Sequence, residues 1–485
     1  MLSNAGDAAP RIRVSSPLVL DLDGTLTYTD TLLESVLLLL KRSPWMIFHL
    51  VFWALQGPWA LKSQVARRVT LHVAALPWRQ DLLDWLRGQH AAGRTLVLAT
   101  AAHRSVAQAA ADHLQLFDHV LATDGGVNLK GPRKLAAIQA LVGPDFVYAG
   151  DSRADLPIWS ASAAVVLADV APALAARIPS AIPVEARFQR AAGGLALWLK
   201  AIRVHQWVKN LLLLVPLFTA FAFNQADKVL AAGLIFVAFS LAASGTYVMN
   251  DLWDLENDRQ HPRKKDRAFA SGRIGVMAGV AAAVLLVAAG LLLALALSKS
   301  AALALAGYVV LTTAYSWTLK GYVLIDVITL ALLYTYRVLA GAVATGIEVS
   351  AWLLAFSAFT FFSLALVKRC AELVTLEHAG RKVAQGRDYR VSDLVVLWPF
   401  GTAASVSAVV VFGLYASAPE TAARFTRPQG LWLVALGMMY WYGRLWIKTA
   451  RGEMDDDPIV FALRDRGSRI AVLAMAALFA GSHWF

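Results

Sequence analysis

The sequence predicts two fold classes in one chain of 485 residues, an α/β domain followed by an all-α membrane domain. Residues 1–195 alternate short apolar runs with Ala- and Leu-rich helical stretches, which is typical of a parallel sheet covered by helices. Residues 196–485 hold about nine apolar segments near twenty residues long, the length that spans a bilayer core. The composition agrees, because only 16% of the residues are charged, whereas soluble domains carry about a quarter.

The net charge of +12 allows two interpretations. A strongly basic chain can bind nucleic acid, but a multi-pass membrane protein reaches the same value by gathering Lys and Arg on its cytoplasmic side. We therefore expect membrane lipids, and no nucleic acid, as partners. The single cysteine, Cys370, excludes an internal disulfide. Residues 1–17 lack the apolar core of a signal peptide, so the first domain is expected in the cytoplasm.

Four apolar runs in the first domain are predicted to be buried parallel strands, because each is short and ends at acids or Thr. They are PLVLDLDG, RTLVLAT, DFVYAGD and AAVVLAD, beginning at residues 17, 94, 145 and 163. The Pro-spaced stretch 171–188 is predicted as the exit from this domain.

The first strand delivers two carboxylates, Asp21 and Asp23, to a Gly turn. Side chains two residues apart on a strand face the same way. One carboxylate can attack phosphorus while the other transfers a proton, and Mg²⁺ would offset their repulsion. The pattern alone also fits acids at the solvent edge of a sheet.

Further candidate residues follow in order along the domain. Thr100 ends the second strand with a hydroxyl that can hold a phosphoryl oxygen. Lys134, with Lys130 as a weaker alternative, offers a cation to balance a transferring phosphoryl group. Asp151 and Asp155 come after another strand and are hard oxygen ligands suited to Mg²⁺.

These four motifs, in this order, resemble the haloacid dehalogenase (HAD) phosphatase superfamily over about 170 residues. The resemblance implies a Rossmannoid sheet with Asp21 as nucleophile and Asp23 as general acid/base. It also implies Thr100 and Lys134 as phosphate-binding residues. The implied Mg²⁺ ligands are Asp21, Asp23, Asp151 and Asp155.

HAD enzymes insert a helical cap between their first two motifs, here at about residues 27–92. The cap contains LLESVLLLL and WMIFHLVFWAL, apolar runs of nine and eleven residues that are too short to span a bilayer. They predict either buried cap helices or a cap that dips into the membrane surface. In the second case Trp45, Trp53 and Trp59 would suit the interface.

The charge of the loops predicts how the second domain is oriented. The predicted spans lie roughly at 209–225, 229–249, 276–297, 301–318, 323–344, 351–367, 392–415, 429–447 and 469–484. Alternate loops and their edges hold nineteen Lys and Arg on one side and four on the other. Because the basic side is cytoplasmic, we expect a cytoplasmic-membrane protein with its first domain inside and its C-terminus outside.

Ten charges gather where the second predicted span ends, in residues 250–267. Asn250, Asp251, Asp254 and Asp258 have spacings that place them on one face of a helix. Three neighbouring carboxylates repel one another unless cations lie between them, and Mg²⁺ with a pyrophosphate fits that need. The bases after them can neutralise phosphates; they are Arg259, Arg263, Lys264, Lys265 and Arg267. A solvated loop that only fixes topology would explain the bases but not the acid spacing.

NDxxDxxxD at the end of a span, followed by HPRKKDRAFASG, resembles the UbiA superfamily of intramembrane prenyl-transferring enzymes over about 280 residues. The resemblance implies nine spans around a lipid-open cavity with Mg²⁺-diphosphate at its cytoplasmic mouth. The family's second motif is often DxxxD, but this chain offers Tyr315, Lys320 and Asp326 there. That departure counts against an ordinary isoprenyl-diphosphate site.

Other residues of the spans resemble one branch, decaprenyl-phosphate phosphoribosyltransferase. The first span opens as RVHQWVKNLLLLVPLF, with Lys209 and Asn210. Arg337 lies within the fifth span, where an Arg is costly and by default functional, although a structural pairing with an acid is the alternative. The set is completed by Lys368, Arg369, Glu372 and Arg390. The branch's usual RPIASG segment is DRAFASG here.

The resemblance implies two linked reactions. Phosphoribosyl pyrophosphate (PRPP) would bind as the Mg²⁺-diphosphate, and polyprenyl phosphate would take its 5-phosphoribosyl group. The attached phosphatase would then remove the 5-phosphate, leaving polyprenyl-phosphoryl ribose, a lipid-linked pentose donor. Two alternatives are an aromatic prenyltransferase with an attached phosphatase, and a transport or lipid-binding protein regulated by the HAD-like domain. The sequence leaves open the polyprenyl chain length and whether the chain forms a homo-oligomer.

Overall fold

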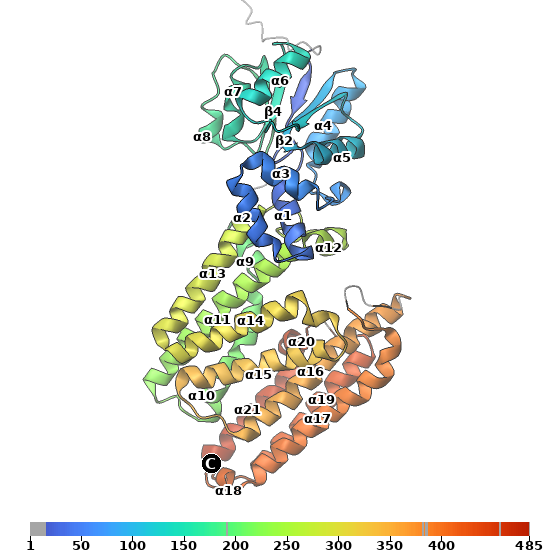
Figure 1. Ribbon diagram of the computed structural model, residues 1–485. Helices are drawn as coiled ribbons and strands as arrows, with labels where there is room; N and C mark the ends of the chain where they lie inside the picture. The colour runs from blue at the N-terminus through green and yellow to red at the C-terminus, as the bar shows by residue number, and fades with distance from the viewer. Residues whose placement is uncertain (1–15, 191–192, 381–382, 384–386, 455–456, 485) are drawn as a thin grey trace, which may run out of the picture. The chain divides into compact units, whose positions relative to one another are not determined.

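The computed structural model describes residues 16–190, 193–380, 383, 387–454 and 457–484 (Figure 1). Residues 1–15, on which the signal-peptide prediction mainly rests, lie outside them. The chain forms two compact units. Unit 1 comprises Met1–Ile202 and Val248–Ala282, and unit 2 comprises Arg203–Tyr247 and Ala283–Phe485. The acidic segment predicted for the membrane domain therefore belongs to unit 1.

Unit 1 is built on a six-stranded parallel sheet with strand order β3-β2-β1-β4-β5-β6. The strands are β1 Leu18–Leu20, β2 Leu96–His103, β3 His119–Thr123, β4 Val147–Gly150, β5 Ala164–Ala168 and β6 Val184–Phe188. The four predicted strands are present. The edge strands β3 and β6 were not predicted, and β6 lies inside the stretch 171–188 that was interpreted as an exit.

The strand order reverses its direction beside β1, which pairs with β2 on one side and β4 on the other. In open parallel sheets a crevice forms at the carboxyl ends of the strands at such a switch point. Asp21 follows β1 and Asp151 follows β4, so the fold itself brings their side chains to one edge.

Helices cover the sheet and form the cap of unit 1 (Figure 1). The layer around the sheet contains α4 Gln80–Ala91, α5 Arg104–Leu114, α6 Pro132–Val142, α7 Leu156–Trp159, α8 Pro172–Ala175 and the 3-10 turns η1 Val73–Ala75 and η2 Arg153–Asp155. The cap consists of α1 Thr31–Arg42, α2 Met46–Leu55 and α3 Pro58–Ala66. These three lie within the predicted 27–92. Their apolar core includes Leu39, Leu50 and Val65.

The rest of unit 1 comes from the ends of two long apolar helices. Helix α11, Ala226–Trp253, begins in unit 2 and ends in unit 1, and α13, Val276–Leu297, does the reverse. Between them lies α12, Leu255–Gln260. Arg190 ties this segment to the HAD-like part, since its Nη1 donates to the carbonyl of Gly272 at 2.5 Å.

Unit 2 is helical and rich in membrane-spanning candidates. Its long helices are α14 Lys299–Trp317, α15 Ile325–Thr345, α16 Ala351–His378, α17 Leu394–Ser417, α19 Gly430–Ala450 and α21 Arg466–Trp484. Its shorter elements are η3 Val204–Leu214, α10 Val215–Thr219, η4 Leu319–Gly321, η5 Val391–Asp393, α18 Pro419–Ala422 and α20 Pro458–Arg464. The short helix α9, Leu195–Ala201, belongs to unit 1. Among the described residues, six helices are long and apolar enough to cross a membrane.

The predicted fold class is confirmed, and the count of nine spans is approximate. The predicted spans at 429–447 and 469–484 coincide with α19 and α21, which are not among those six helices. The predicted span at 209–225 is instead a 3-10 segment followed by the short helix α10. Pro216, near the start of α10, cannot donate a backbone hydrogen bond, which favours a new helix start there.

Candidate active sites

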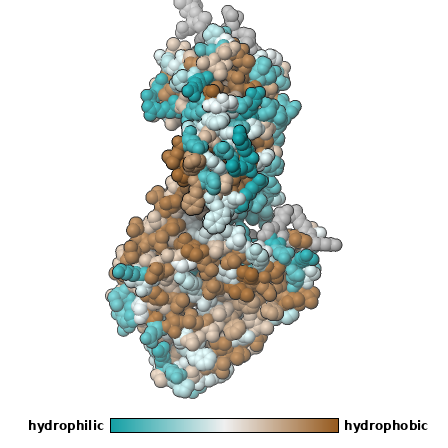
Figure 2. Space-filling view, in the orientation of Figure 1, coloured by the Kyte–Doolittle hydropathy of each residue, from teal (hydrophilic) through white to brown (hydrophobic). Residues whose placement is uncertain are grey.

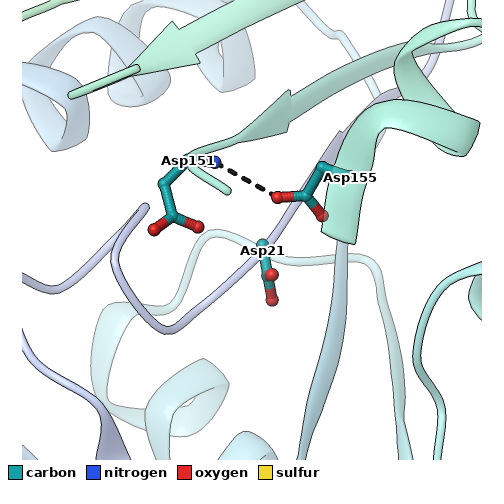
Figure 3. A group of neighbouring side chains, drawn as sticks. All are labelled: Asp21, Asp151 and Asp155. Atoms are coloured by element: carbon teal, nitrogen blue, oxygen red, sulfur yellow. Dashed lines mark hydrogen bonds between the residues drawn. The ribbon is translucent and has the colours of Figure 1, made fainter. Parts of the chain in front are cut away.

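Three carboxylates converge at the carboxyl edge of the sheet (Figure 3). One oxygen from each of Asp21, Asp151 and Asp155 lies within 4.8 Å of the others. They come from the ends of β1 and β4 and from η2. Carboxylate oxygens in this number are ligands that Mg²⁺ accepts, completing its shell with water or phosphate oxygens. The donor set therefore fits a hard divalent cation.

The chain holds Asp155 and Lys134 in fixed positions within this cluster. One oxygen of Asp155 accepts the Tyr148 hydroxyl at 2.8 Å, and the other accepts the backbone N–H of Ser152 at 3.1 Å. Lys134 Nζ donates to that same Tyr148 hydroxyl at 2.9 Å and lies 2.9 Å from Asp21 Oδ2. The buried ammonium is thus positioned beside the predicted nucleophile.

The carboxyl pKa values of the site indicate that its negative charge is not fully balanced by the chain. Burial, and then the charges of Asp21 and Asp155, raise the pKa of Asp151 to about 8. Burial, and then the charge of Asp30, raise the pKa of Asp23 to about 7. Burial also raises the pKa of Asp21, although Lys134 opposes the shift. Carboxylates crowded in a low-dielectric site stay ionised at neutral pH only if positive charge enters it.

A glycine turn and a hydrogen bond to the start of α1 shape the space around the nucleophile. Gly24 has φ +75°, and a Cβ there would lie 2.1 Å from Asp151 Oδ2, so only Gly fits the turn. Asp23 Oδ1 accepts the backbone N–H of Thr31 at 2.8 Å, which ties it to the start of α1. Asp23 is outside the group of three carboxylates, and its predicted role as a metal ligand stays a prediction.

A cavity of about 400 Å³ opens over these residues and is lined by the sheet edge, the cap and the first turn of α13. Lys62 of α3 lines it, and its Nζ donates to the carbonyl of Ala101 at 2.6 Å and to Asn128 Oδ1 at 2.9 Å. Sequence reasoning missed Lys62, although a lone Lys in the apolar run PWALKSQVA was a usable signal. Lys130 lines the same cavity. Thr100 is fully buried, and its hydroxyl oxygen accepts the backbone N–H of Ala102 at 3.0 Å.

The residues of the second acidic group lie on helices α11 and α12, which are separated only by a break at Asp254. The N–H of Asp258 still donates to the Asp254 carbonyl at 2.8 Å, which preserves the helical spacing. Arg267 Nη1 lies 3.2 Å from Asp251 Oδ1 and 2.6 Å from Asp258 Oδ2. Lys41 of the cap lies 3.9 Å from Asp254. Cations from the chain itself thus lie between these acids.

The five predicted phosphate-binding bases of this loop differ in their surroundings. Arg259 forms a two-pronged pair with Glu34 of α1, at 2.6 and 2.5 Å, and both side chains are buried. Lys264 lies 4.0 Å from Asp258. Arg263 and Lys265 are exposed. Arg259 therefore binds a carboxylate of the HAD cap in this structure, and its predicted phosphate role stays a prediction.

In unit 2, Arg337 is buried on α15 and bonded to neutral groups. Its Nε donates to Asn210 Oδ1 at 2.9 Å, its Nη1 to the Leu333 carbonyl at 2.8 Å and its Nη2 to the Tyr308 hydroxyl at 2.7 Å. The structure thus brings together Arg337 and Asn210, which the sequence singled out separately. The acid pairing weighed as an alternative is not among these bonds.

Two further groups of predicted residues form ion pairs in unit 2. Lys209 binds the carboxylate of Asp457, which sequence reasoning missed. Arg369 lies 2.5 Å from Asp326, both fully buried, and Asp326 also accepts the Tyr315 hydroxyl at 2.8 Å. Glu372 joins this network through Arg369 and through Arg387, which was not predicted. Lys320 lies in η4, Lys368 is half-buried on α16, and Arg390 is exposed before η5.

Comparison with known families gives the two halves separate matches. Residues 212–464 match the UbiA prenyltransferase family, more than half of the chain. The chain belongs to the UbiA prenyltransferase family. Residues 18–160 match the haloacid dehalogenase-like hydrolases. Both resemblances expected from the motifs are confirmed, and the family together with the six apolar helices identifies an integral membrane protein.

Several curated proteins are similar to this UbiA-family chain. "Uncharacterized protein y4nM" of Sinorhizobium fredii is 37% identical over 96% of this chain and 90% of its own length. "Nodulation protein NoeC" of Azorhizobium caulinodans is 35% identical over 57% of this chain and 90% of its own. "Decaprenyl-phosphate phosphoribosyltransferase" of Mycolicibacterium smegmatis is 31% identical over 59% and 92%. Among solved structures, a UbiA homolog from Archaeoglobus fulgidus bound to GPP and Mg²⁺ covers 59% of this chain and 98% of its own, with 18% identity and a TM-score of 0.44.

Proposed function

We propose that this chain is a bifunctional membrane enzyme that makes polyprenyl-phosphoryl ribose in two steps. One observation carries the proposal: a HAD-type carboxylate cluster with a buried Lys134 occurs in the same chain as a UbiA-family domain. The relatives that match that domain include proteins named decaprenyl-phosphate phosphoribosyltransferase, at 31% identity. A phosphatase joined to such a transferase has an evident substrate, the 5-phosphate of the transferred ribose.

In the first step an oxygen of polyprenyl phosphate bonds to the anomeric carbon of PRPP. The bond from that carbon to the pyrophosphate oxygen breaks, and pyrophosphate leaves with the electron pair. The acidic group of Asn250, Asp251, Asp254 and Asp258 would bind the departing diphosphate through Mg²⁺. Bases and neutral hydrogen-bond donors of the loop and of the spans would hold the two anions together. The candidates are Lys209, Asn210, Arg263, Lys264, Lys265, Arg267, Tyr315, Lys320, Arg337, Lys368 and Arg369.

In the second step Asp21 attacks the phosphorus of the 5-phosphate, and the bond from phosphorus to the ribose oxygen breaks. Asp23 gives a proton to that oxygen, and its pKa of about 7 keeps a substantial protonated fraction at neutral pH. Water then attacks the aspartyl phosphate while Asp23 takes a proton back, releasing phosphate. Lys134 stabilises the transferring group, 2.9 Å from Asp21 Oδ2. Mg²⁺ held by Asp21, Asp151 and Asp155 would add neutralising charge there.

The proposal includes an orientation. Unit 1 would lie in the cytoplasm, where PRPP is available, and the chain would span the cytoplasmic membrane. Both sites would then work on the same membrane face, which raises the local concentration of the phosphorylated lipid intermediate.

The test is product analysis with the purified full chain in proteoliposomes containing polyprenyl phosphate, PRPP and Mg²⁺. We expect pyrophosphate and then phosphate to be released in equal amounts, with a pentose added to the lipid. Labelled pyrophosphate should exchange into PRPP only when polyprenyl phosphate is present. Absence of pentosyl lipid, with turnover of an isoprenyl diphosphate and an aromatic acceptor instead, would identify an aromatic prenyltransferase and overturn the proposal.

A further inference from the structure

Helix α2 of the cap has one apolar face that the described residues leave uncovered. The exposed fractions are 77% for Trp45, 73% for Phe48, 58% for Val51, 58% for Phe52 and 83% for Leu55. Their spacing places them along one side of the helix. Figure 2 shows hydrophobic residues gathered on the flank where Figure 1 labels α2. Large exposed apolar patches of this kind mark interaction surfaces.

The opposite face of α2 is an ordinary core face. Leu50 and Trp53 are 7% and 5% exposed and pack with Leu39 and Val65 of the neighbouring cap helices. The helix is therefore anchored to its unit on one side and exposes an apolar face on the other.

The charge of the cap indicates what that face contacts. Between Glu34 and Asp81 the sequence contains no acidic residue. The same stretch contains six bases, which are Lys41, Arg42, Lys62, Arg67, Arg68 and Arg79. Arg42, Arg67 and Arg68 are exposed. An apolar face beside exposed bases, with Trp at its edge, is the pattern of a helix that lies in an anionic membrane surface.

A membrane-entering segment lies in the same unit. Val276, Met277 and Ala278 begin α13, an apolar helix long enough to span a bilayer, and they line the phosphatase cavity together with Leu32 and Leu33 of the cap. Met277 is 58% exposed. The cavity wall thus includes the first turn of a membrane span, so the cap that closes the cavity lies where this span begins.

The length of α2 excludes a crossing. Ten residues of α-helix extend about 15 Å, whereas the hydrocarbon core is about 30 Å thick. A membrane contact by this helix would therefore place it along the surface, with its apolar side chains in the lipid.

We infer that α2 is an interfacial helix that inserts the face formed by Trp45, Phe48, Val51, Phe52 and Leu55 into the anionic leaflet from which α13 emerges. This contact holds the phosphatase cavity at the lipid headgroups. The cavity then takes phosphate monoesters presented on a lipid, and soluble phosphate esters meet it less often. That substrate class rests on the proposed function, whereas the membrane contact does not.

Spin labelling of the full chain tests the contact without using either reaction. Single cysteines would replace Phe48, Phe52 and Leu55 in a Cys370→Ala background, since Cys370 is the one native cysteine. Gln108, exposed on α5, provides the matched control position. In vesicles of phosphatidylcholine and phosphatidylglycerol, labels on α2 should be relaxed by oxygen more than by a water-soluble nickel chelate. The label at position 108 should show the reverse.

A second set of variants tests whether the exposed arginines of the cap contribute to the membrane contact. Arg42→Gln with Arg67→Gln should shift the α2 labels toward the chelate, and Arg133→Gln, an exposed base on α6, should not. Labels on α2 that prefer the chelate in the unaltered protein would overturn the inference. Spin–spin broadening between copies would also overturn it, because the face would then bind a second copy of the chain. Neither outcome would bear on PRPP use or phosphate release, so failure of the proposed function remains distinguishable.

Discussion

The two carboxylate groups of this chain differ in how they are assembled and balanced. Asp21 is far in the sequence from Asp151 and Asp155, and the three meet at a sheet edge with one buried lysine beside them. The acids of residues 250–258 lie close together in the sequence and share cations from the loop that follows them, chiefly Arg267. The carboxylates that the fold assembles at the sheet edge outnumber the one lysine beside them, so their excess negative charge requires a metal ion. The negative charge of the acids in residues 250–258 is partly balanced by the bases of the same segment.

That difference indicates what each group contributes to the proposed reactions. The sheet-edge group has raised carboxyl pKa values because burial outweighs the single lysine. The helical group has an arginine that bridges Asp251 and Asp258 and that an incoming Mg²⁺-diphosphate can attract to its own oxygens. We therefore expect the first to bind its metal tightly and the second to bind metal mainly together with substrate.

The largest effect should come from the helical acids. Asp254→Asn and Asp258→Asn should each lower pentosyl transfer by about a hundredfold or more, the scale of losing one electrostatic contact in a site. Phosphatase activity should be unchanged. Initial rates of pyrophosphate release measure the first effect, and hydrolysis of p-nitrophenyl phosphate measures the second.

Asp266→Asn is the matched control for those variants. Asp266 lies in the same loop but is exposed. It should transfer at the wild-type rate. Normal transfer by both Asp254→Asn and Asp258→Asn would mean that the acidic spacing serves topology alone.

A smaller effect is expected at Arg337, which has no counterpart in the sheet-edge group. Lysine cannot reach Asn210 and Tyr308 at once or bind phosphate through two nitrogens. Arg337→Lys should keep the fold and raise the KM for polyprenyl phosphate or PRPP about tenfold, roughly the cost of one charged hydrogen bond. Arg427→Lys, in a loop outside the spans, is the control. Unchanged KM and kcat for both substrates would assign Arg337 a structural role.

The smallest effect is on stability and concerns the excess negative charge of the sheet-edge carboxylates. The pKa of Asp151 is raised to about 8 from a usual 3.8. Between those two pH values the metal-free folded state therefore keeps a proton that the unfolded state has lost. The stability from this group is present at low pH and is lost as pH rises through about 8. In chelator, the unfolding temperature of unit 1 should fall by a few degrees between pH 5 and 8.5.

Adding Mg²⁺ should reverse that loss, with a larger rise at pH 8.5 than at pH 5, because metal and protons compete for the carboxylates. Asp151→Asn should flatten the pH dependence and weaken the Mg²⁺ effect. A stability that rises with pH in chelator would contradict this excess negative charge.

Local patterns carried most of what the sequence predicted. Short apolar runs mark the strands that precede Asp21 and Asp151, and the acid spacing around Asp254 is a helical repeat. The run before Thr100 also marks a strand, but β2 continues to His103, so Thr100 lies within it and does not end it as predicted. The order of the strands and the edge strands β3 and β6 were not predictable, because HVLAT and VEARF are only partly buried and their pairing depends on distant partners.

Partners of buried charges were the main omission. Glu34 with Arg259, Lys209 with Asp457 and Glu372 with Arg387 join residues far apart or on different helices. No spacing rule links such residues, since only tertiary packing brings them together. For the same reason Arg259 looked like a free base in the sequence, whereas the fold gives it a carboxylate.

The central claim is that the two groups act in sequence on one lipid, and the mass of the lipid product tests it most directly. Asp21→Asn removes the nucleophile, since a carboxamide does not attack phosphorus as a carboxylate does, and it leaves residues 250–258 intact. With PRPP and polyprenyl phosphate, mass spectrometry of the extracted lipid should show a product heavier than the wild-type product by one phosphoryl unit. The same lipid from both enzymes would contradict the account, because the HAD-type site would then act on another substrate.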